Sequence, residues 1–430
     1  MFARAVVRRF PVLGYRDFRL LLADRLLAPA AFGFSLVGVS FAVLYTTGST
    51  ADLSYVLAAQ IAPSLIFTLV GGVFADRFPP QWVIVAANIM IAVGEGAFGL
   101  LVLAGHPQLW QMLLLETLTG TGMAIFYPAA QAIVPRLVPG DLVQEAFAIS
   151  RIAMNAGQMG GAVVAGLCVA AFGPGWALVA CGVGMLGTVP MLLSIRTARD
   201  IRVKSTGMLR ELREGWSEFR SHTWLWVIVA QFAVVLMAWY GGFQILGPVV
   251  AKTDLGGPAA WGAITAAESV GLIVGGIVSL RFTPGRPMLF IAVMGTAIAV
   301  SPLSLAMLWP LPVICLASLG LGITMEIMMV QWTVALTQHI PPGMLARVSS
   351  YDAMGSVVAM PIGALIAGPL AAAIGVSATQ YGAAVLILVA SALALIPRDI
   401  RTMRAGAGLE PDPDQATSSA SPVNAAHIAA

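Results

Sequence analysis

Two eight-residue stretches of this chain resemble one another, although they lie almost half the chain apart. Residues 71–78 read Gly-Gly-Val-Phe-Ala-Asp-Arg-Phe and residues 275–282 read Gly-Gly-Ile-Val-Ser-Leu-Arg-Phe, so four of the eight positions are identical. Each stretch ends a long apolar segment and leads, through a short turn that contains proline, into another. A repeat at half the chain length indicates internal duplication. Two duplicated apolar halves predict a membrane carrier whose substrate site lies between them.

The duplication is visible at two further places, in the same order along both halves. Residues 122–131 correspond to residues 322–331, and the two segments begin and end with the same residue types. Pro139-Gly140 and Pro342-Gly343 then begin the next segment of each half. The three pairs are offset by 200–204 residues, and this agreement in order and spacing favours duplication over chance.

The composition places the chain in a membrane. Hydrophobic residues make up 59% of the sequence and charged residues 10%, whereas soluble domains have roughly 45–50% and 25%. A bilayer crossing needs about 20 apolar residues, and it is helical because a lipid-exposed backbone has to satisfy its own hydrogen bonds. We predict an all-α polytopic membrane protein with about twelve transmembrane helices in two pseudo-symmetric six-helix bundles. The predicted spans are 20–46, 52–75, 82–104, 109–134, 142–172, 174–195, 223–250, 258–280, 286–308, 311–337, 344–373 and 376–396.

Lys and Arg lie almost entirely on one side of this predicted topology. Of the 23 Lys and Arg residues, only Lys252 falls in a loop of the other side, while Arg25 and Arg151 lie inside predicted spans. The positive-inside rule therefore predicts that both termini are cytoplasmic and that the number of spans is even. Asp24 and Arg25 interrupt the apolar stretch that a signal peptide would need, which favours an uncleaved first span. We expect a multi-pass protein of the cell (inner or plasma) membrane.

Four regions follow from this topology. We predict an N-terminal six-helix bundle over residues 1–196, a cytoplasmic linker over 197–222, a C-terminal six-helix bundle over 223–397, and a disordered cytoplasmic tail over 398–430. Within the linker, residues 208–219 place their apolar side chains on one stripe, which predicts an amphipathic helix on the membrane surface. This helix either serves as a covalent connection with a lipid-facing stripe or has a regulatory role.

The turns after the second and eighth spans resemble those of a known family. The sequence Gly72-x-x-x-Asp76-Arg77 in the turn after the second span, with a degenerate copy that keeps Arg281 after the eighth, resembles the signature of the major facilitator superfamily. The resemblance covers about residues 15–397, and residues 15–21, 47–49 and 331–333 look like the drug and siderophore exporter branch. It implies a secondary transporter that works by alternating access.

The resemblance also implies a role for the signature residues Gly72, Asp76, Arg77 and Arg281, which is a conformational latch rather than a substrate contact. A carboxylate at position 76 near the N-terminus of span eleven would be stabilised by the helix dipole. Leu280 stands where the second copy would have its acid, so we expect the latch to belong to the first half. The alternative is a capped, solvated turn.

A glycine pattern in span five partly resembles the family's antiporter motif. Gly157, Gly161 and Gly166 match its glycines, whereas Ala162 replaces its proline. Without that proline the helix loses a typical cause of kinking. The pattern therefore predicts either close helix packing or a marker of antiport.

Ionisable residues inside predicted spans are the strongest signal of function, because each is costly in hydrocarbon and is usually kept for a purpose. Here they are Glu268, Glu326, Glu95, Glu116 and Arg151. A carboxyl group in hydrocarbon favours its neutral form, so it can bind and release a proton near neutral pH. We expect Glu268 and Glu326 to be the first candidates for proton or cation coupling. For Glu95 and Glu116 the alternative is an interhelical salt bridge with Arg151.

Several large side chains are candidates for lining an apolar substrate cavity, with the alternative that each belongs to the core or faces lipid. They are Phe41, Tyr127, Trp239, Tyr240, Gln331 and Trp332. The chain has no phosphate-binding Gly-Lys-Ser/Thr loop. Its three Cys and four His residues are scattered without metal-type spacing. We therefore expect no cofactor, no metal site and no enzymatic activity.

These observations together favour proton-coupled efflux of an amphipathic or hydrophobic small molecule such as a drug, siderophore or secondary metabolite. The expected partners are this substrate, protons and the lipid bilayer, with no nucleic acid, and we expect a monomer. An uptake carrier or a lysophospholipid flippase on the same fold is the first alternative. A non-transporting membrane sensor or scaffold is the second.

Overall fold

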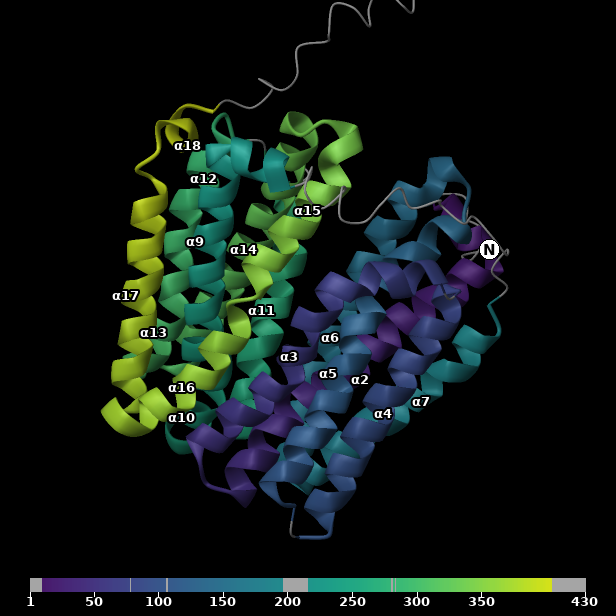
Figure 1. The fold of residues 1–430 in the computed structure, drawn as a ribbon. Helices are drawn as coiled ribbons and strands as arrows, with labels where there is room; N and C mark the ends of the chain where they lie inside the picture. The colour runs from purple at the N-terminus through teal and green to yellow at the C-terminus, as the bar shows by residue number, and fades with distance from the viewer. Residues whose placement is uncertain are drawn as a thin grey trace, which may run out of the picture.

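The computed structural model describes residues 10–403, apart from residues 78, 106, 196–215, 280 and 283. Within the helices, the side chains of residues 65–77, 127, 141, 144, 342–343, 345–347, 350, 353 and 357 are also outside the description. All the regular elements in the described part are helical, which confirms the predicted fold class. Figure 1 shows them as two bundles that lie side by side.

The described part of the N-terminal bundle contains six long helices. They are α2 (Arg16–Thr46), α3 (Thr50–Arg77), α4 (Pro80–Leu103), α5 (Leu109–Ile133), α6 (Val143–Phe172) and α7 (Pro174–Leu193). Helix α6 ends at Gly173, whose φ of 90° is readily adopted by glycine alone, and Pro174 then begins α7. The C-terminal bundle repeats this turn at Gly375, with a φ of 94°. The same glycine turn between two helices therefore occurs at matching positions of the two halves.

The C-terminal bundle is more fragmented than the sequence predicts. Its helices are α9 (Thr223–Trp239), α10 (Gly247–Asp254), α11 (Pro258–Ser279), α12 (Pro287–Met294), α13 (Val300–Ala306), α14 (Leu311–His339), α15 (Pro342–Val357), α16 (Met360–Ile374), α17 (Val376–Ala394) and α18 (Arg398–Thr402). Three predicted spans are each divided into two α-helices. A π-helical turn, Tyr240–Ile245, separates α9 from α10, and a 3-10 turn, Gly295–Ala299, separates α12 from α13. The third break precedes Pro361, whose ring removes a backbone donor.

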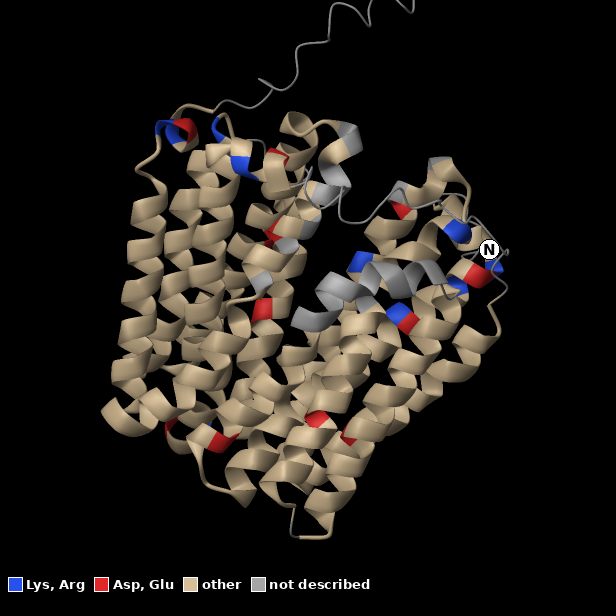
Figure 2. Cartoon of the chain, viewed as in Figure 1, with Lys and Arg blue, Asp and Glu red and all other residues tan. Residues whose placement is uncertain are grey.

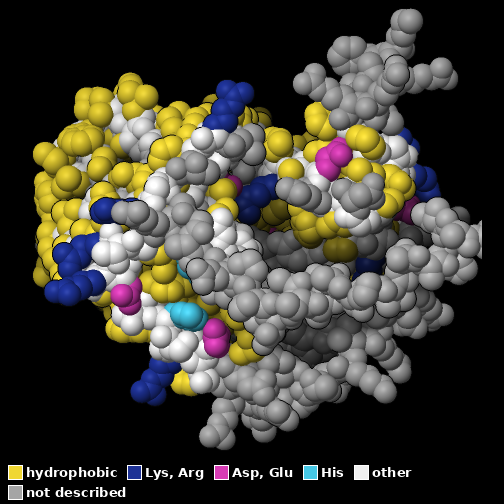
Figure 3. Space-filling model, turned by 90° about the horizontal axis from the view of Figure 1, so that it is seen from above, with side chains coloured by type: hydrophobic (Ala, Val, Ile, Leu, Met, Phe, Trp, Pro, Cys, Tyr) yellow, Lys and Arg dark blue, Asp and Glu magenta, His cyan; other side chains and the backbone are white. Residues whose placement is uncertain are grey.

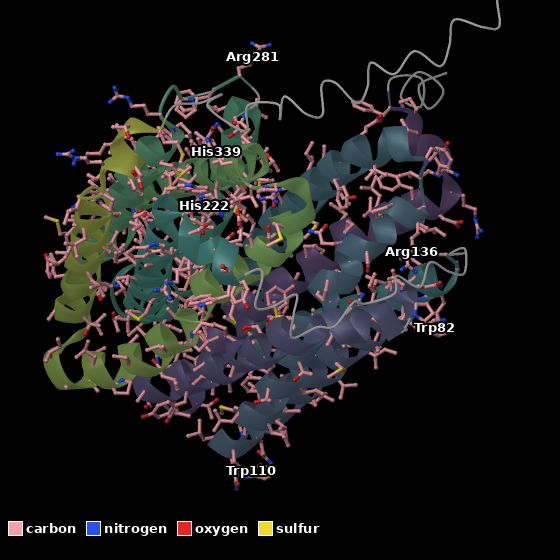
Figure 4. All side chains as sticks on the ribbon, turned by 45° about the horizontal axis from the view of Figure 1, so that its top comes forward. Trp82, Trp110, Arg136, His222, Arg281 and His339 are labelled. Atoms are coloured by element: carbon pink, nitrogen blue, oxygen red, sulfur yellow. The ribbon has the colours of Figure 1, made fainter. Side chains whose placement is uncertain are left out.

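Ten helical stretches among the described residues are long and apolar enough to cross a membrane. The other two predicted spans, 52–75 and 109–134, coincide with α3 and α5, which have 28 and 25 residues. Figure 4 shows Trp110 and Trp82 pointing outward near opposite ends of the N-terminal bundle, and both are more than half exposed. Tryptophan prefers the two interfaces of a bilayer. The exposed tryptophans and helix lengths together identify a multi-span membrane protein.

We call the end that carries residue 10 and α18 the terminal end, and the other the distal end. In Figure 2 the Lys and Arg positions lie mostly toward the terminal end, and Figure 3, which views that end, shows several of their side chains on it. The tail predicted from residue 398 begins with the short helix α18, which corrects its boundary. Residues 404–430 lie outside the described part.

The described end of the linker packs on protein rather than on lipid. Residues 216–221 are helical, and the ring of Phe219 is 6.0 Å from that of Tyr351 in α15. Phe219 is buried, while Trp216, 5.4 Å from Tyr351, is half exposed. The lipid-facing stripe is therefore wrong for Phe219, because its ring finds an aromatic partner in the C-terminal bundle. The rest of the predicted linker helix lies outside the described residues.

Candidate functional site

A cavity of about 490 Å³ lies between the two bundles. Helices α2, α3, α5 and α6 line it from one half, and α9, the π-helical turn, α11 and α16 line it from the other. Its size falls in the usual range of small-molecule sites, and its wall is mostly apolar with a few polar groups. Those polar groups are Gln60, Ser64, Gln158, Tyr240, Gln244, Thr265, Glu268 and Ser269.

The π-helical turn contributes two of these polar side chains. It follows Trp239 and brings Tyr240 and Gln244 to the cavity wall. Single π-helical turns inside α-helices are frequent at functional sites. The buried amide of Gln380 supports the turn by donating to the Gly242 carbonyl oxygen at 3.1 Å. The turn thus replaces regular helix by a geometry that aims polar groups inward.

Glu268 is the acid that the cavity exposes. It lies in α11, which the sequence predicted near the membrane midplane, and its side chain lines the cavity. Within the described part of the chain, its carboxyl group has no hydrogen-bond or ion-pair partner. The neighbouring hydroxyl groups of Thr265 and Ser269 instead bond to backbone carbonyl oxygens of their own helix. Glu268 is therefore available to a proton or to a cargo molecule.

Arg151 joins the two halves through Glu326. Arg151 Nε and Nη2 of α6 donate to Glu326 Oε1 and Oε2 of α14 at 3.2 and 3.0 Å, a bidentate pair. Such forked pairs are stronger and more directional than single bonds. A Cβ atom on Gly275 would lie 3.0 Å from Glu326 Cβ, which places the pair beside Gly275. Gly275 is roughly two helical turns, or about 10 Å, beyond Glu268 along α11 toward the terminal end.

Glu95 and Glu116 are fully buried in the N-terminal bundle. Glu95 Oε1 accepts a hydrogen bond from Ser35 Oγ at 2.6 Å, and Glu116 Oε2 accepts one from Gln60 Nε2 at 2.7 Å. The expected alternative, in which one of them pairs with Arg151, is not what the structure shows, because Arg151 reaches across to Glu326.

Of the side chains expected to line the cavity, Trp239 and Tyr240 do so. Phe41 is instead fully buried in the packing core, with its ring 5.7 Å from that of Tyr45. Gln331 donates to the Phe282 carbonyl oxygen at 2.8 Å, and Trp332 Nε1 donates to Asp352 Oδ2 at 2.8 Å. These three side chains are occupied by structural contacts away from the cavity lining. The side chain of Tyr127 lies outside the described residues.

Three cavity residues that the sequence analysis missed are the glutamines Gln60, Gln158 and Gln244. Their position inside predicted apolar spans, which identified the acids, could also have identified these glutamines. An amide inside a hydrocarbon span also needs partners, and each of these glutamines lies within a predicted span. Gln331 was the one amide among the predicted cavity residues, and it lies away from the cavity lining.

The signature residues Gly72, Asp76 and Arg77 lie in the last two turns of α3, which continues through the predicted turn. Their side chains are outside the described set, so the latch stays a prediction. Helix α15, the first part of span eleven, packs against α3. Arg281 is exposed and points away from the bundles at the terminal end in Figure 4.

At the distal end the two halves are sealed together. One buried apolar cluster there includes Val39, Val43 and Val56 of the first half and Ile245 and Ala364 of the second. Helix α16 also packs closely on α3, where a Cβ on Gly368 would lie 2.7 Å from Ala51 Cα. Lys252 Nζ donates to the Leu44 carbonyl oxygen at 2.6 Å. These contacts close the cavity on that side.

The terminal end of the N-terminal bundle is packed differently. Its buried apolar cluster includes Val12, Leu21, Ile84 and Leu192, and all its members belong to the N-terminal half. The halves are therefore joined by apolar packing distally, while the Arg151–Glu326 pair crosses between them on the terminal side of the cavity. This asymmetry is what a carrier closed toward one side of the membrane requires.

The glycines of the span-five pattern serve two contacts. Gly157 and Gly161 face the backbone of α2, where an added Cβ would collide with the carbonyl oxygens of Leu26 and Ala30. Gly166 faces the other half, since its Cβ would lie 3.0 Å from the Pro258 carbonyl oxygen of α11. The pattern thus packs α6 on α2 within one half and on α11 between the halves.

This packing gives a prediction with a matched control. Gly161→Ala should lower the Tm of the detergent-purified protein, because the new methyl group forces α6 from α2 at a cost of about 1–3 kcal/mol. Gly160→Ala, one residue away, meets no atom within 4 Å and should be neutral or stabilising by about 0.5–1 kcal/mol through helix propensity. Equal Tm values for the two variants would show that the α2–α6 contact is looser than described.

Comparison with known proteins adds to this picture. The sequence model of the Major Facilitator Superfamily matches residues 26–351. Curated relatives named Enterobactin exporter EntS, from Escherichia coli O1:K1 / APEC and from Escherichia coli O81 (strain ED1a), are each 26% identical over 395 residues, which cover 90% of this chain and 93% of theirs.

Solved structures agree on the fold. A mutant of the nucleoside transporter NupG has a TM-score of 0.72 at 11% identity and covers 88% of this chain and 99% of that one. A bacterial homolog of the human lysosomal transporter Spinster, solved inward-facing and unoccupied, has a TM-score of 0.67 at 17% identity and covers 89% of this chain and 97% of that one. At these identities the likeness concerns the fold alone.

Proposed function

We propose a function for this chain from the premise that it belongs to the major facilitator superfamily and is therefore a transporter of small molecules, not an enzyme. The proposed activity is proton-coupled efflux of an amphipathic or hydrophobic molecule by alternating access. The observation that carries the proposal is the cavity between the halves, into which Glu268 points without a partner in the described part of the chain.

The cavity lining supports an amphipathic cargo. Phe32, Leu36 and Trp239 provide apolar area, while the glutamine amides provide hydrogen bonds without fixed charge. A smaller pocket of about 130 Å³ adjoins the cavity through Phe32, Met123 and Gln158, and Met154 and Met185 also line it. Flexible methionine surfaces suit ligands of varied shape. We therefore infer a site that accepts several related molecules.

Glu268 is the proposed coupling acid. Because it is the acidic side chain in the described cavity lining, proton and cargo meet at the same place. A proton on Glu268 removes its charge, and a cargo group that needs this carboxylate competes with that proton. Binding of one then favours release of the other, which is the exchange that antiport requires. Glu326 takes a different part in the proposal, as an inter-half lock with Arg151.

The direction and orientation are inferred from two observations. The relatives that cover most of the chain are named enterobactin exporters, which favours export. The Lys and Arg residues lie mostly toward the terminal end (Figure 2), which favours both termini in the cytoplasm of a cell that holds the protein in its inner or plasma membrane. In this orientation the described conformation is closed toward the outside. We propose that the monomer is the working unit.

Inverted membrane vesicles with an acidic lumen test the proposal. Labelled enterobactin, an aromatic dye and an amphipathic antibiotic are added outside, and lumenal accumulation is followed with the gradient present or collapsed. We expect at least one compound to accumulate only with the gradient, and vesicles that lack the protein provide the control. Accumulation that ignores the gradient would remove proton coupling. Gradient-driven loss of preloaded compound would indicate uptake in the cell.

A further inference from the structure

Two carboxyl groups are buried together inside the N-terminal bundle, away from the acid already assigned. Glu95 of α4 and Glu116 of α5 have no solvent exposure, and their charges interact with each other. Each has one oxygen in a hydrogen bond, to Ser35 and to Gln60 respectively. The second oxygens, Glu95 Oε2 and Glu116 Oε1, have no hydrogen-bond partner among the described residues.

No cation balances this pair in the described part of the chain. The bidentate partner of Arg151 is Glu326, and Lys252 bonds to the Leu44 carbonyl oxygen at the distal end. Among the described residues, the other ionisable groups that interact with the pair are Cys181 of α7 and Tyr240 of the π-helical turn, and neither can carry a positive charge. Burial of two interacting carboxylates without a counter-ion favours protonation of at least one of them.

A third polar group in the same place is also unpartnered. Thr119 of α5, one turn beyond Glu116, is fully buried, and its Oγ1 has no hydrogen-bond partner in the description. It points at α4 next to Glu95, because a Cβ on Gly94 would collide with this oxygen. Buried polar atoms are nearly always satisfied. Three buried polar side chains of α4 and α5 therefore each have an oxygen that is unpartnered in the described structure, and a proton would remove the charge from one of the acids.

The chain places this pair within reach of the cavity through Gln60. Gly120 allows the α5 backbone to approach the Gln60 carbonyl group of α3 so closely that any side chain would collide with it. Gln60 then donates to Glu116 while its side chain also forms part of the cavity wall. Gln60 therefore links Glu116 to the cavity wall.

We propose that Glu95 and Glu116 form a proton-binding site of the N-terminal half, in which at least one of the two carboxyl groups holds a proton that exchanges with the cavity past Gln60. The carrier then has one protonatable site in each half, because Glu268 belongs to α11. The existence of this site is independent of the transport activity proposed above; its part in coupling rests on that activity.

Infrared difference spectroscopy of the purified full-length protein tests the site without any cargo. The spectrum of wild type minus that of the Glu95→Gln/Glu116→Gln double variant should show a C=O band of a protonated carboxyl group, because the variant lacks this band. The spectrum of wild type minus that of Glu268→Gln should not contain this C=O band. If the double variant does not fold, each single variant should lose or shift the same component. A protonated-carboxyl band that is unchanged in all these variants would overturn the proposal.

A separate infrared measurement tests proton exchange past Gln60. Gln60→Leu removes the donor to Glu116 while keeping a side chain of similar volume, so we expect the carboxyl component to shift and its exchange into D₂O to change in rate. Gln244→Leu changes a cavity amide that bonds to neither acid and should leave both unchanged. Equal spectra for wild type and Gln60→Leu would refute exchange past Gln60. Failure of transport would leave these spectra unaffected, so the two proposals fail separately.

Discussion

Glu268→Gln should abolish the dependence of transport on the pH gradient while leaving the protein folded. Gln has the size and polarity of Glu but does not bind or release a proton near neutral pH. No contact in the described structure is broken, because the Glu268 carboxyl group lines the cavity without a partner. Coupling between two ligands typically amounts to about 1–3 kcal/mol, so gradient-driven accumulation should fall roughly 5–150-fold. The inverted-vesicle assay measures this directly.

Two companion variants separate loss of coupling from loss of charge. Glu268→Asp keeps an acid in the cavity and should retain part of the gradient response. Asp254→Asn neutralises an exposed acid at the end of α10 and should behave as wild type. Exchange of labelled compound without a gradient should persist in Glu268→Gln, since the rest of the binding site remains. Accumulation by Glu268→Gln equal to that of wild type would exclude Glu268 as the coupling acid.

Much of the fold was predictable because hydrocarbon imposes simple rules on a sequence. The lengths of the apolar segments predict the spans, and the sequence repeat at residues 71–78 and 275–282 predicts the two halves. The breaks within spans were not predicted, since hydropathy does not report how backbone hydrogen bonds are arranged. Their local signals are modest: Gly241-Gly242 lies in the π-helical turn, and Pro361 follows the break in span eleven. Many transmembrane helices carry such residues without breaking.

The candidate site was predictable only in part, for a different physical reason. The cost of an acid in hydrocarbon singles out Glu268, whatever its neighbours are. The partner of Arg151 could not be identified, because Glu326 is 175 residues away in the sequence and helical periodicity relates only residues within one helix. Side-chain size was also a poor guide to which residues line the cavity. Phe41 is large and apolar, which suits a cavity wall, but the same property lets it fill the packed core.

Reversing either charge of the Arg151–Glu326 pair should disturb transport more than neutralising it. Arg151→Glu or Glu326→Arg places two like charges across the interface between the halves, where the native pair is 3.0 Å apart. At about 4 Å this repulsion amounts to roughly 1 kcal/mol in water and 4 kcal/mol at an effective dielectric near 20. The Arg151 side chain is 56% exposed, so the lower part of this range applies. Every 1.4 kcal/mol changes the ratio of two conformations about tenfold.

The double reversal, Arg151→Glu with Glu326→Arg, should recover much of what each single reversal loses, since the attraction is restored across the same gap. Spin labels at positions 136 and 286, exposed on different halves, report the distance between the halves in a background without the native cysteines. Single reversals should shift this distance distribution, Glu326→Gln should shift it less, and the double reversal should return it toward wild type. Asp17→Arg, which reverses a charge beside Arg16 within one half, is the matched control. A wild-type distribution in both single reversals would mean that the pair bridges the halves without biasing their equilibrium, and alternating access would then depend on the distal seal alone.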